Sequence, residues 1–389
     1  MTHQNFYYLH LMIATGLLAG PTAVSTDMID IPLKRMHQFS AAKMNAKPFL
    51  LIQIDTTEGV TGIGEGTTPG IWWGGESVET MKLVIEHYFT PLLIGEDPHQ
   101  IEKLLVKLDR HVLGNEFAKA TVEMALYDIV GKLANVPVSH FFGGVVHDGI
   151  PVRWALAAGS IEADIQEGRE KVERLEHHNF KMKAGTIPTE EDIKRVIDVS
   201  TGLNGLTTTG VDPNGSWDEL TTLRWMDCLH EANVDFLEQP LPKWDFVGLS
   251  RLKSTGKVPI MADESASTIQ DALTLAKMNA VDIFSLKIHK SGGMSRVKKI
   301  AAIAEAAGIP CFGGTSLESS IGTAACLHVY STLPNLTEGC ELFGPVWLAD
   351  DIVKDPVVFK NEKVYVPNKP GLGVTLDLDK VDKYRRKTR

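Results

Sequence analysis

The sequence predicts an α/β protein, a TIM-type (β/α) barrel preceded by an α+β capping domain. From Val152 onward, short apolar strands alternate with amphipathic helices. The late strand ends, at 212, 238, 263, 287, 314 and 341, recur every 24 to 27 residues. A βα unit of that length, repeated around a closed sheet, gives such a barrel. The chain has 389 residues, and a barrel needs roughly 250, so a second domain is expected.

Eight barrel strands are expected from the apolar runs. They are Val152–Ala158, Phe180–Ala184, Thr207–Asp212, Asp235–Glu238, Ile260–Asp263, Ile283–Ile288, Cys311–Gly314 and Gly339–Leu342.

The residues before the barrel have the pattern of an α+β unit. An antiparallel meander is expected over Met28–Phe39, Pro48–Thr56 and Gly59–Glu65, followed by helices over Ser77–Leu93, Asp97–Val112 and Phe117–Leu133. The predicted domain limits are a leader of uncertain order or misplaced start (1–27), the capping domain (28–145), the barrel (146–355) and a C-terminal segment that packs back on the capping domain (356–389).

Composition excludes some classes of function. The chain is 43% hydrophobic and 23% charged, with a net charge of −10. Apart from the tail 383–389 it has no dense Lys/Arg run, which argues against nucleic-acid binding. No stretch reads as a membrane span. The four cysteines lack CxxC pairing, so free thiols and a cytoplasmic location are expected.

The run Phe180-Lys181-Met182-Lys183 places two lysines on one face of a strand. Barrel strands carry helices outside and have no exposed edge, so both lysines are expected to point into the barrel mouth, where active sites of this fold lie. Mutual repulsion should lower the pKa of one lysine and make it a general acid or base. The alternative is a solvent-facing pair on an edge strand.

Three carboxylates, Asp212, Glu238 and Asp263, end three successive strands. Each alone could cap the next helix. In phase with the barrel period, they instead favour a site for a hard divalent cation, Mn²⁺ or Mg²⁺, which prefers oxygen ligands.

Other polar residues also follow apolar strands. Lys287 is expected to act as a second acid/base or as a cation, and Glu341 to face the mouth, whereas Glu318 can cap the following helix. The glycine pair before Thr315 can bring backbone N–H groups to a substrate carboxylate. The candidate substrate contacts are Asn214, Gly314, Thr315 and, in the lid-like loop 67–75, Trp72 and Trp73.

The motifs K-x-K, D-x-N, E-Q-P, A-D-E-S and S-L-K, in this order, resemble the enolase superfamily, whose lysine-plus-metal enolate chemistry is a known pattern. Residues 313–350 and Pro370-Gly371-Leu372-Gly373-Val374 resemble its muconate lactonizing branch. The resemblance covers about residues 28–383.

This resemblance implies a muconate cycloisomerase that converts cis,cis-muconate, a dicarboxylate, reversibly to muconolactone during catechol degradation. The metal would hold one carboxylate and stabilise the enolate, which Lys183 would protonate. Lys181 would tune Lys183 and hold substrate carboxylate, and Glu341 matches the second active-site residue of the family. Homo-oligomers are common among the members.

Alternatives remain open within the same frame. A chloromuconate cycloisomerase, an o-succinylbenzoate synthase and an N-acylamino acid racemase would use the same metal and lysines, and Lys183 with Lys287 could serve a racemase. A dipeptide epimerase is disfavoured because Gly-Cys-Glu-Leu replaces its Asp-x-Asp. A catalytically dead barrel would lack a ligand or lysine, and none is missing.

Overall fold

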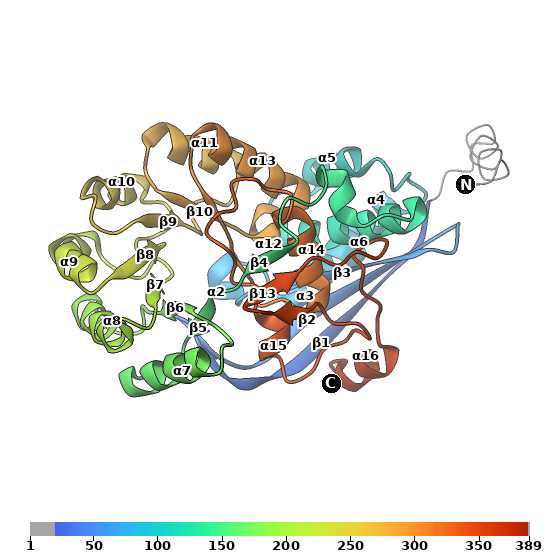
Figure 1. The fold of residues 1–389 in the computed structure, drawn as a ribbon. Helices are drawn as coiled ribbons and strands as arrows, with labels where there is room; N and C mark the ends of the chain where they lie inside the picture. The colour runs from blue at the N-terminus through green and yellow to red at the C-terminus, as the bar shows by residue number, and fades with distance from the viewer. Residues whose placement is uncertain (1–19, 388–389) are drawn as a thin grey trace.

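The computed structural model describes residues 20–387 (Figure 1). Its N-terminal sheet is an antiparallel meander of β1 (Pro21–Gln38), β2 (Lys43–Thr56) and β3 (Thr61–Gly66). β1 begins before the predicted Met28 because residues 21–27 pair with the C-terminal half of β2. The prediction of a leader over 1–27 is therefore wrong for residues 21–27, and residues 1–19 lie outside the described part.

The middle of β2, the central strand of the N-terminal sheet, is buried on both faces. Along β2, Leu50, Ile52 and Ile54 pack into one apolar cluster with the helices that follow the sheet, whereas Phe49 and Leu51 join the larger cluster of the barrel. Successive side chains of a strand point to opposite faces. The continuous apolar run of β2 thus joins the helices to the barrel.

Helices lie in the three predicted ranges, and two short helical segments, at 71–74 in the predicted lid loop and at 138–142, were not predicted. The helical elements are α2 (Ile71–Gly74), α3 (Val78–Val84), the π-helical segment η1 (Ile85–Phe89), α4 (Thr90–Leu93), α5 (Ile101–His111), α6 (Glu116–Ala134) and the 3₁₀ segment η2 (Val138–Phe142).

The longest of these helices, α6, lies directly on β3. A Cβ added to Gly62 would lie 2.3 Å from the carbonyl oxygen of Ala125, and one added to Gly64 would lie 2.4 Å from that of Thr121. The alternating glycines of β3 therefore let the helix backbone approach the strand.

Seven parallel strands, each bonded to the next in chain order, form the barrel wall. They are β5 (Trp154–Leu156), β6 (Asn179–Lys183), β7 (Thr208–Asp212), β8 (Val234–Glu238), β9 (Ile260–Ala262), β10 (Ile283–Leu286) and β11 (Cys311–Gly313). The helices between and after them are α7 (Ile161–Glu173), α8 (Thr189–Leu203), α9 (Glu219–Glu231), α10 (Phe246–Ser254), α11 (Ile269–Met278), α12 (Ile288–Ser291), α13 (Met294–Ala306) and α14 (Ser320–Tyr330).

The predicted eighth strand, Gly339–Leu342, is reduced to bridges at one residue. Cys340 bridges Val152 on one side and Gly313 on the other, both in parallel. The amide of Glu341 donates to the carbonyl of Gly313 at 2.8 Å, and that of Arg153 donates to Cys340 at 2.7 Å. The barrel is closed as predicted, but its last strand is too short to count as a regular element.

The C-terminal segment returns to the N-terminal sheet, as Figure 1 shows for α16 beside β1. After α15 (Gly344–Trp347), the segment contains β12 (Phe359–Lys360), β13 (Lys363–Tyr365) and α16 (Leu378–Tyr384), and β13 pairs with β4 (Gly149–Pro151). An ion pair between the guanidinium of Arg386 and Asp30 of β1, at 2.6 Å, holds the C-terminal end against the N-terminal sheet. Within residues 20–387, none of the helices has the length and apolarity needed to cross a bilayer.

Candidate active site

The predicted carboxylates meet at the carboxyl ends of neighbouring strands. Asp212 ends β7, Glu238 ends β8 and Asp263 follows β9. All three are fully buried. Lys183 of β6 pairs in register with Asp212, so the topology brings the acids and the lysine pair to one end of the barrel.

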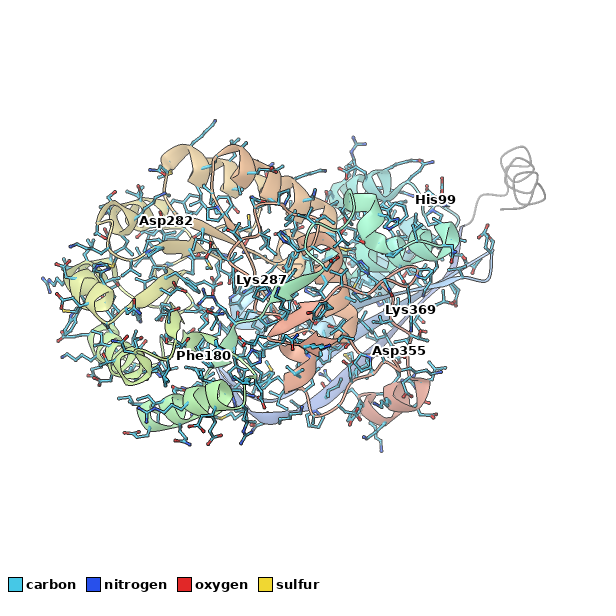
Figure 2. All side chains as sticks on the ribbon, in the orientation of Figure 1. His99, Phe180, Asp282, Lys287, Asp355 and Lys369 are labelled. Atoms are coloured by element: carbon cyan, nitrogen blue, oxygen red, sulfur yellow. The ribbon has the colours of Figure 1, made fainter. Side chains whose placement is uncertain are left out.

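Each carboxylate is held by a lysine. Lys183 Nζ lies 2.5 Å from Asp212, and Lys287 Nζ lies 2.5 Å from Asp263. Lys181 Nζ contacts Glu238, Glu341 at 2.5 Å and Asp212 at 3.2 Å. Together these groups form one interlaced network of ammonium and carboxylate groups. Lys287, labelled in Figure 2, lies near the middle of that view, where the barrel meets the rest of the molecule.

Repulsion between Lys181 and Lys183 was expected to determine the pKa of one of them, but neighbouring carboxylates have the larger effect. Burial disfavours the ammonium of Lys181, but Glu238, Glu341 and Asp212 hold its pKa well above the usual value. Burial likewise opposes the charge of Asp212, yet Lys183 and Lys181 keep its pKa below the usual range. The prediction that the pair is governed by mutual repulsion is therefore wrong for Lys181, because three carboxylates outweigh one neighbouring ammonium.

The two lysines of β6 also differ in access. Lys183 keeps 9% of its side chain exposed and lines a pocket, whereas Lys181 is fully enclosed. The expectation that Lys181 holds substrate carboxylate does not fit this placement. Lys183 is the member of the pair that a bound molecule can reach.

The donor set suits a hard divalent cation chemically, since it consists of carboxylate oxygens. One of them, Glu238 Oε1, is buried and has no hydrogen-bond partner within the described chain. In residues 20–387, however, no three His, Cys, Asp or Glu side chains stand grouped as a ready set of ligands. Lysines contact other oxygens of the three carboxylates, so an ion that used those oxygens would compete with ammonium groups. The assignment of Asp212, Glu238 and Asp263 as ligands stays a prediction.

Two further residues complete the carboxylate end of the site and were given no role from the sequence. Lys290 donates to Asp263 Oδ1 at 2.8 Å and to the carbonyl of Ser285 at 2.8 Å. Glu264 is half-buried, and desolvation together with the charges of Asp263 and Asp212 raises its pKa to about 8. Glu264 belongs to the A-D-E-S motif, so its position was visible in the sequence, whereas nothing marked Lys290.

The predicted lid loop lies on this network. Its indole Trp73 Nε1 donates to Glu264 Oε1 at 2.7 Å, and Asn214 Nδ2 donates to the same oxygen at 3.1 Å. Lys287 Nζ lies 4.6 Å from the centre of the Trp73 ring, a cation–π arrangement. Trp72 instead packs against Phe39, with ring centres 5.7 Å apart. Trp73 thus contacts Lys287 and Glu264 directly, and both tryptophans line a pocket that also contains Asn214 and Glu264.

A pocket opens where the lid, the barrel mouth and the end of β1 meet. Several predicted residues line it together with residues that the sequence did not single out: His37, Phe39, Pro69, Trp73, Lys183, Asn214, Lys287, Thr315, Leu317, Glu341 and Phe343. The structure therefore brings Lys183, Lys287 and Glu341 to one cavity.

Gly314 does not play the predicted part. Its amide donates to the carbonyl of Leu286 at 2.8 Å, and that of Gly313 donates to Gly339 at 2.9 Å. Both N–H groups are committed to the barrel wall, so neither is available for a substrate carboxylate. A Cβ on Gly314 would lie 2.8 Å from Lys287 Cε, so this glycine leaves room for the lysine.

Glu318, which follows β11, and Glu341, in the short eighth strand Gly339–Leu342, have different roles. Glu341 pairs with Lys181 and lines the pocket. Glu318 accepts a hydrogen bond from the amide of Ser316 at 2.7 Å and lies 3.5 Å from His289. It does not cap the next helix as expected, because Ser319 is the N-cap of α14.

Comparison with known proteins places this chain in the enolase superfamily. Residues 163–381 match the family described as enolase C-terminal domain-like, and residues 23–143 match the N-terminal domain of mandelate racemase / muconate lactonizing enzyme. The chain belongs to the mandelate racemase / muconate lactonizing enzyme family. Members of the superfamily use a divalent metal.

Similar proteins include cycloisomerases of both muconate and chloromuconate. Muconate cycloisomerase 1 of Rhodococcus opacus is 40% identical, and chloromuconate cycloisomerase of Cupriavidus necator is 41% identical, each over 94% of this chain and 98% of the relative. Two solved structures each superpose with a TM-score of 0.92 over 95% of this chain and 100% of theirs. They are 2-chloromuconate cycloisomerase of Rhodococcus opacus, 42% identical, and muconate lactonizing enzyme of Pseudomonas fluorescens complexed with muconolactone, 38% identical.

Proposed function

We propose that this chain is a muconate cycloisomerase, which closes cis,cis-muconate reversibly to muconolactone. The observation that carries the proposal is the pocket in which Lys183 is the accessible lysine, with Glu341 and Lys287 beside it. The likeness to muconate and chloromuconate cycloisomerases over nearly the whole chain supports it.

The proposed reaction is an intramolecular addition. One carboxylate oxygen of the muconate dianion forms a bond to the diene carbon that closes a five-membered lactone. The displaced π electrons move toward the carbon beside the other carboxylate, and Lys183 Nζ gives a proton to that carbon. The products balance as the muconolactone monoanion, and water reprotonates the lysine. General acid catalysis of this kind contributes about 10²- to 10⁴-fold.

Other groups place positive charge close to the reacting substrate. A divalent metal, when bound by Asp212, Glu238 and Asp263, supplies positive charge beside a substrate carboxylate; we propose Mn²⁺, with Mg²⁺ as the alternative. Without a bound metal, Asp263 and Glu238 outweigh burial and raise the pKa of Lys287.

A chloromuconate is the second candidate substrate, because relatives with either name are equally similar to this chain. We also propose that this enzyme is cytoplasmic and forms homo-oligomers.

The test is an ultraviolet assay of the purified chain with Mn²⁺. cis,cis-Muconate, 3-chloromuconate and an N-acylamino acid are compared, the last by loss of optical rotation. Loss of muconate absorbance with formation of muconolactone supports the proposal. Racemisation of the acylamino acid with no turnover of either muconate would overturn it.

A further inference from the structure

We propose that the buried imidazole of His37 binds the second carboxylate of the substrate, the one that closes the ring. This inference rests on the proposed function and assigns a binding residue from the N-terminal sheet to a reaction otherwise carried by the barrel.

The side chain of His37 is placed rigidly at the wall of the pocket. His37 is fully buried near the end of β1 and lines the same cavity as Lys183 and Glu341. Its ring packs against Phe39 and edge-on against Trp347, with ring centres 4.6 and 4.7 Å apart. The β1–β2 register shifts between Pro32 and His37, and such an irregularity redirects side chains beside active sites.

Both ring nitrogens of His37 lack a hydrogen-bond partner in the described part of the chain. A buried polar group left without a partner is costly and calls for an explanation such as a bound molecule. A neutral imidazole offers one N–H donor and one acceptor. The donor is therefore available to an oxygen of a molecule that enters the pocket.

The surroundings of His37 select an anion. Burial is the main reason why the pKa of His37 lies well below the usual value. The other groups that lower this pKa are all cationic: Lys183, Arg35, Lys47 and Lys181. These cations already have partners. Arg35 pairs with Glu167 at 3.0 Å, and Lys47 donates to the carbonyl of Thr68 at 2.7 Å. His37 is thus a free donor in a positive field.

Other groups expected to hold this carboxylate are committed elsewhere. The amide of Gly314 bonds to the barrel wall, and Lys181 is enclosed by three carboxylates. With one substrate carboxylate directed to the metal site, an N–H of His37 would fix the other carboxylate and point its second oxygen at the diene. His37 keeps its proton throughout, so its role is to orient and not to transfer.

The test compares binding of adipate and hexanoate, two saturated six-carbon acids that differ by one carboxylate, by calorimetry on the Mn²⁺-loaded enzyme. The wild type should prefer adipate by about 10- to 100-fold, the range of a hydrogen bond to a charged group. His37→Phe should lose most of this preference, and His37→Asn or His37→Gln should restore part of it through the amide donor.

The matched control is His177→Phe. This substitution changes another buried histidine that packs against a tryptophan, Trp154, but lies outside this pocket. It should keep the wild-type preference. A His37→Phe enzyme that still turns over muconate and keeps the full preference for adipate would overturn the inference alone. A wild type with neither muconate turnover nor a preference for adipate would overturn both the inference and the proposed function.

Discussion

Replacing Lys181 by Met removes the ammonium that three buried carboxylates share. Its Nζ contacts Glu238, Glu341 at 2.5 Å and Asp212 at 3.2 Å, and all of these groups are buried. Removing one partner of a buried ion pair costs about 3–5 kcal/mol, mostly because a charge is left uncompensated. The metal-free variant should therefore lose about that much free energy of unfolding.

Metal should then rescue the variant more than the wild type. At 100 times its dissociation constant, an ion that binds only the folded state adds about 2.7 kcal/mol. In the variant one ammonium fewer competes for Asp212 and Glu238, although Lys183 and Lys287 keep their contacts with Asp212 and Asp263. The ion should therefore bind more tightly and add more stability than it adds to the wild type. The assay is urea unfolding followed by fluorescence, with EDTA or with excess Mn²⁺.

A matched control separates this effect from ordinary loss of an ion pair. Lys119 is also buried and lies 2.8 Å from Asp109, away from the pocket. Lys119→Met should be destabilised without any extra rescue by metal. Equal metal-induced stabilisation of the Lys181→Met, Lys119→Met and wild-type proteins would refute the reasoning that the lysine and the ion use the same carboxylates.

Three further predictions concern the chemistry and the acid stability. Lys183→Ala should lose at least about 10²-fold in kcat but keep its stabilisation by Mn²⁺; rapid turnover would contradict its role as the acid. Glu341→Gln should slow turnover far more than Glu318→Gln, because Glu341 alone of the two lines the pocket; the reverse ranking in a steady-state assay would show that the wrong glutamate was chosen. Acid should lower the free energy of unfolding through His328, because burial lowers the pKa of this histidine to about 4. Its Nδ1 accepts from the amide of Ser139 and its Nε2 contacts the carbonyl of Leu372. Because the unfolded chain binds the proton first, stability should fall from about pH 6.5 to pH 4, by about 3 kcal/mol for this one group. The non-titrating His328→Gln should lose less over that range by urea unfolding, and identical pH slopes would contradict the assignment.

The sequence was sufficient for the barrel because its signals are local and repeated. Each strand is an apolar run ending in a polar residue, and the interval between strand ends is nearly constant. The eighth strand is where this reasoning overreached. Cys340 closes the barrel through single bridges to Val152 and Gly313, and an apolar run cannot reveal how many residues of a strand find partners.

The site was predicted less completely because the charge balance around a residue depends on groups that are distant in the sequence and meet only in the folded structure. The K-x-K spacing placed both lysines on one face, but it could not show that carboxylates from three other strands surround Lys181. His37 could not be found either. It lies in a mixed polar strand, and only the packing of the sheet onto the barrel shows that its ring faces the pocket.

The most direct test of the account is proton NMR of cis,cis-muconate turned over with Mn²⁺ in D₂O. The wild type should form muconolactone that carries one deuterium on the carbon beside the free carboxylate, because Lys183 delivers a solvent-derived proton there. Lys183→Ala should neither form this product nor exchange that position in added muconolactone. Muconolactone formed at the wild-type rate by Lys183→Ala, or no muconolactone from the wild type, would contradict the account.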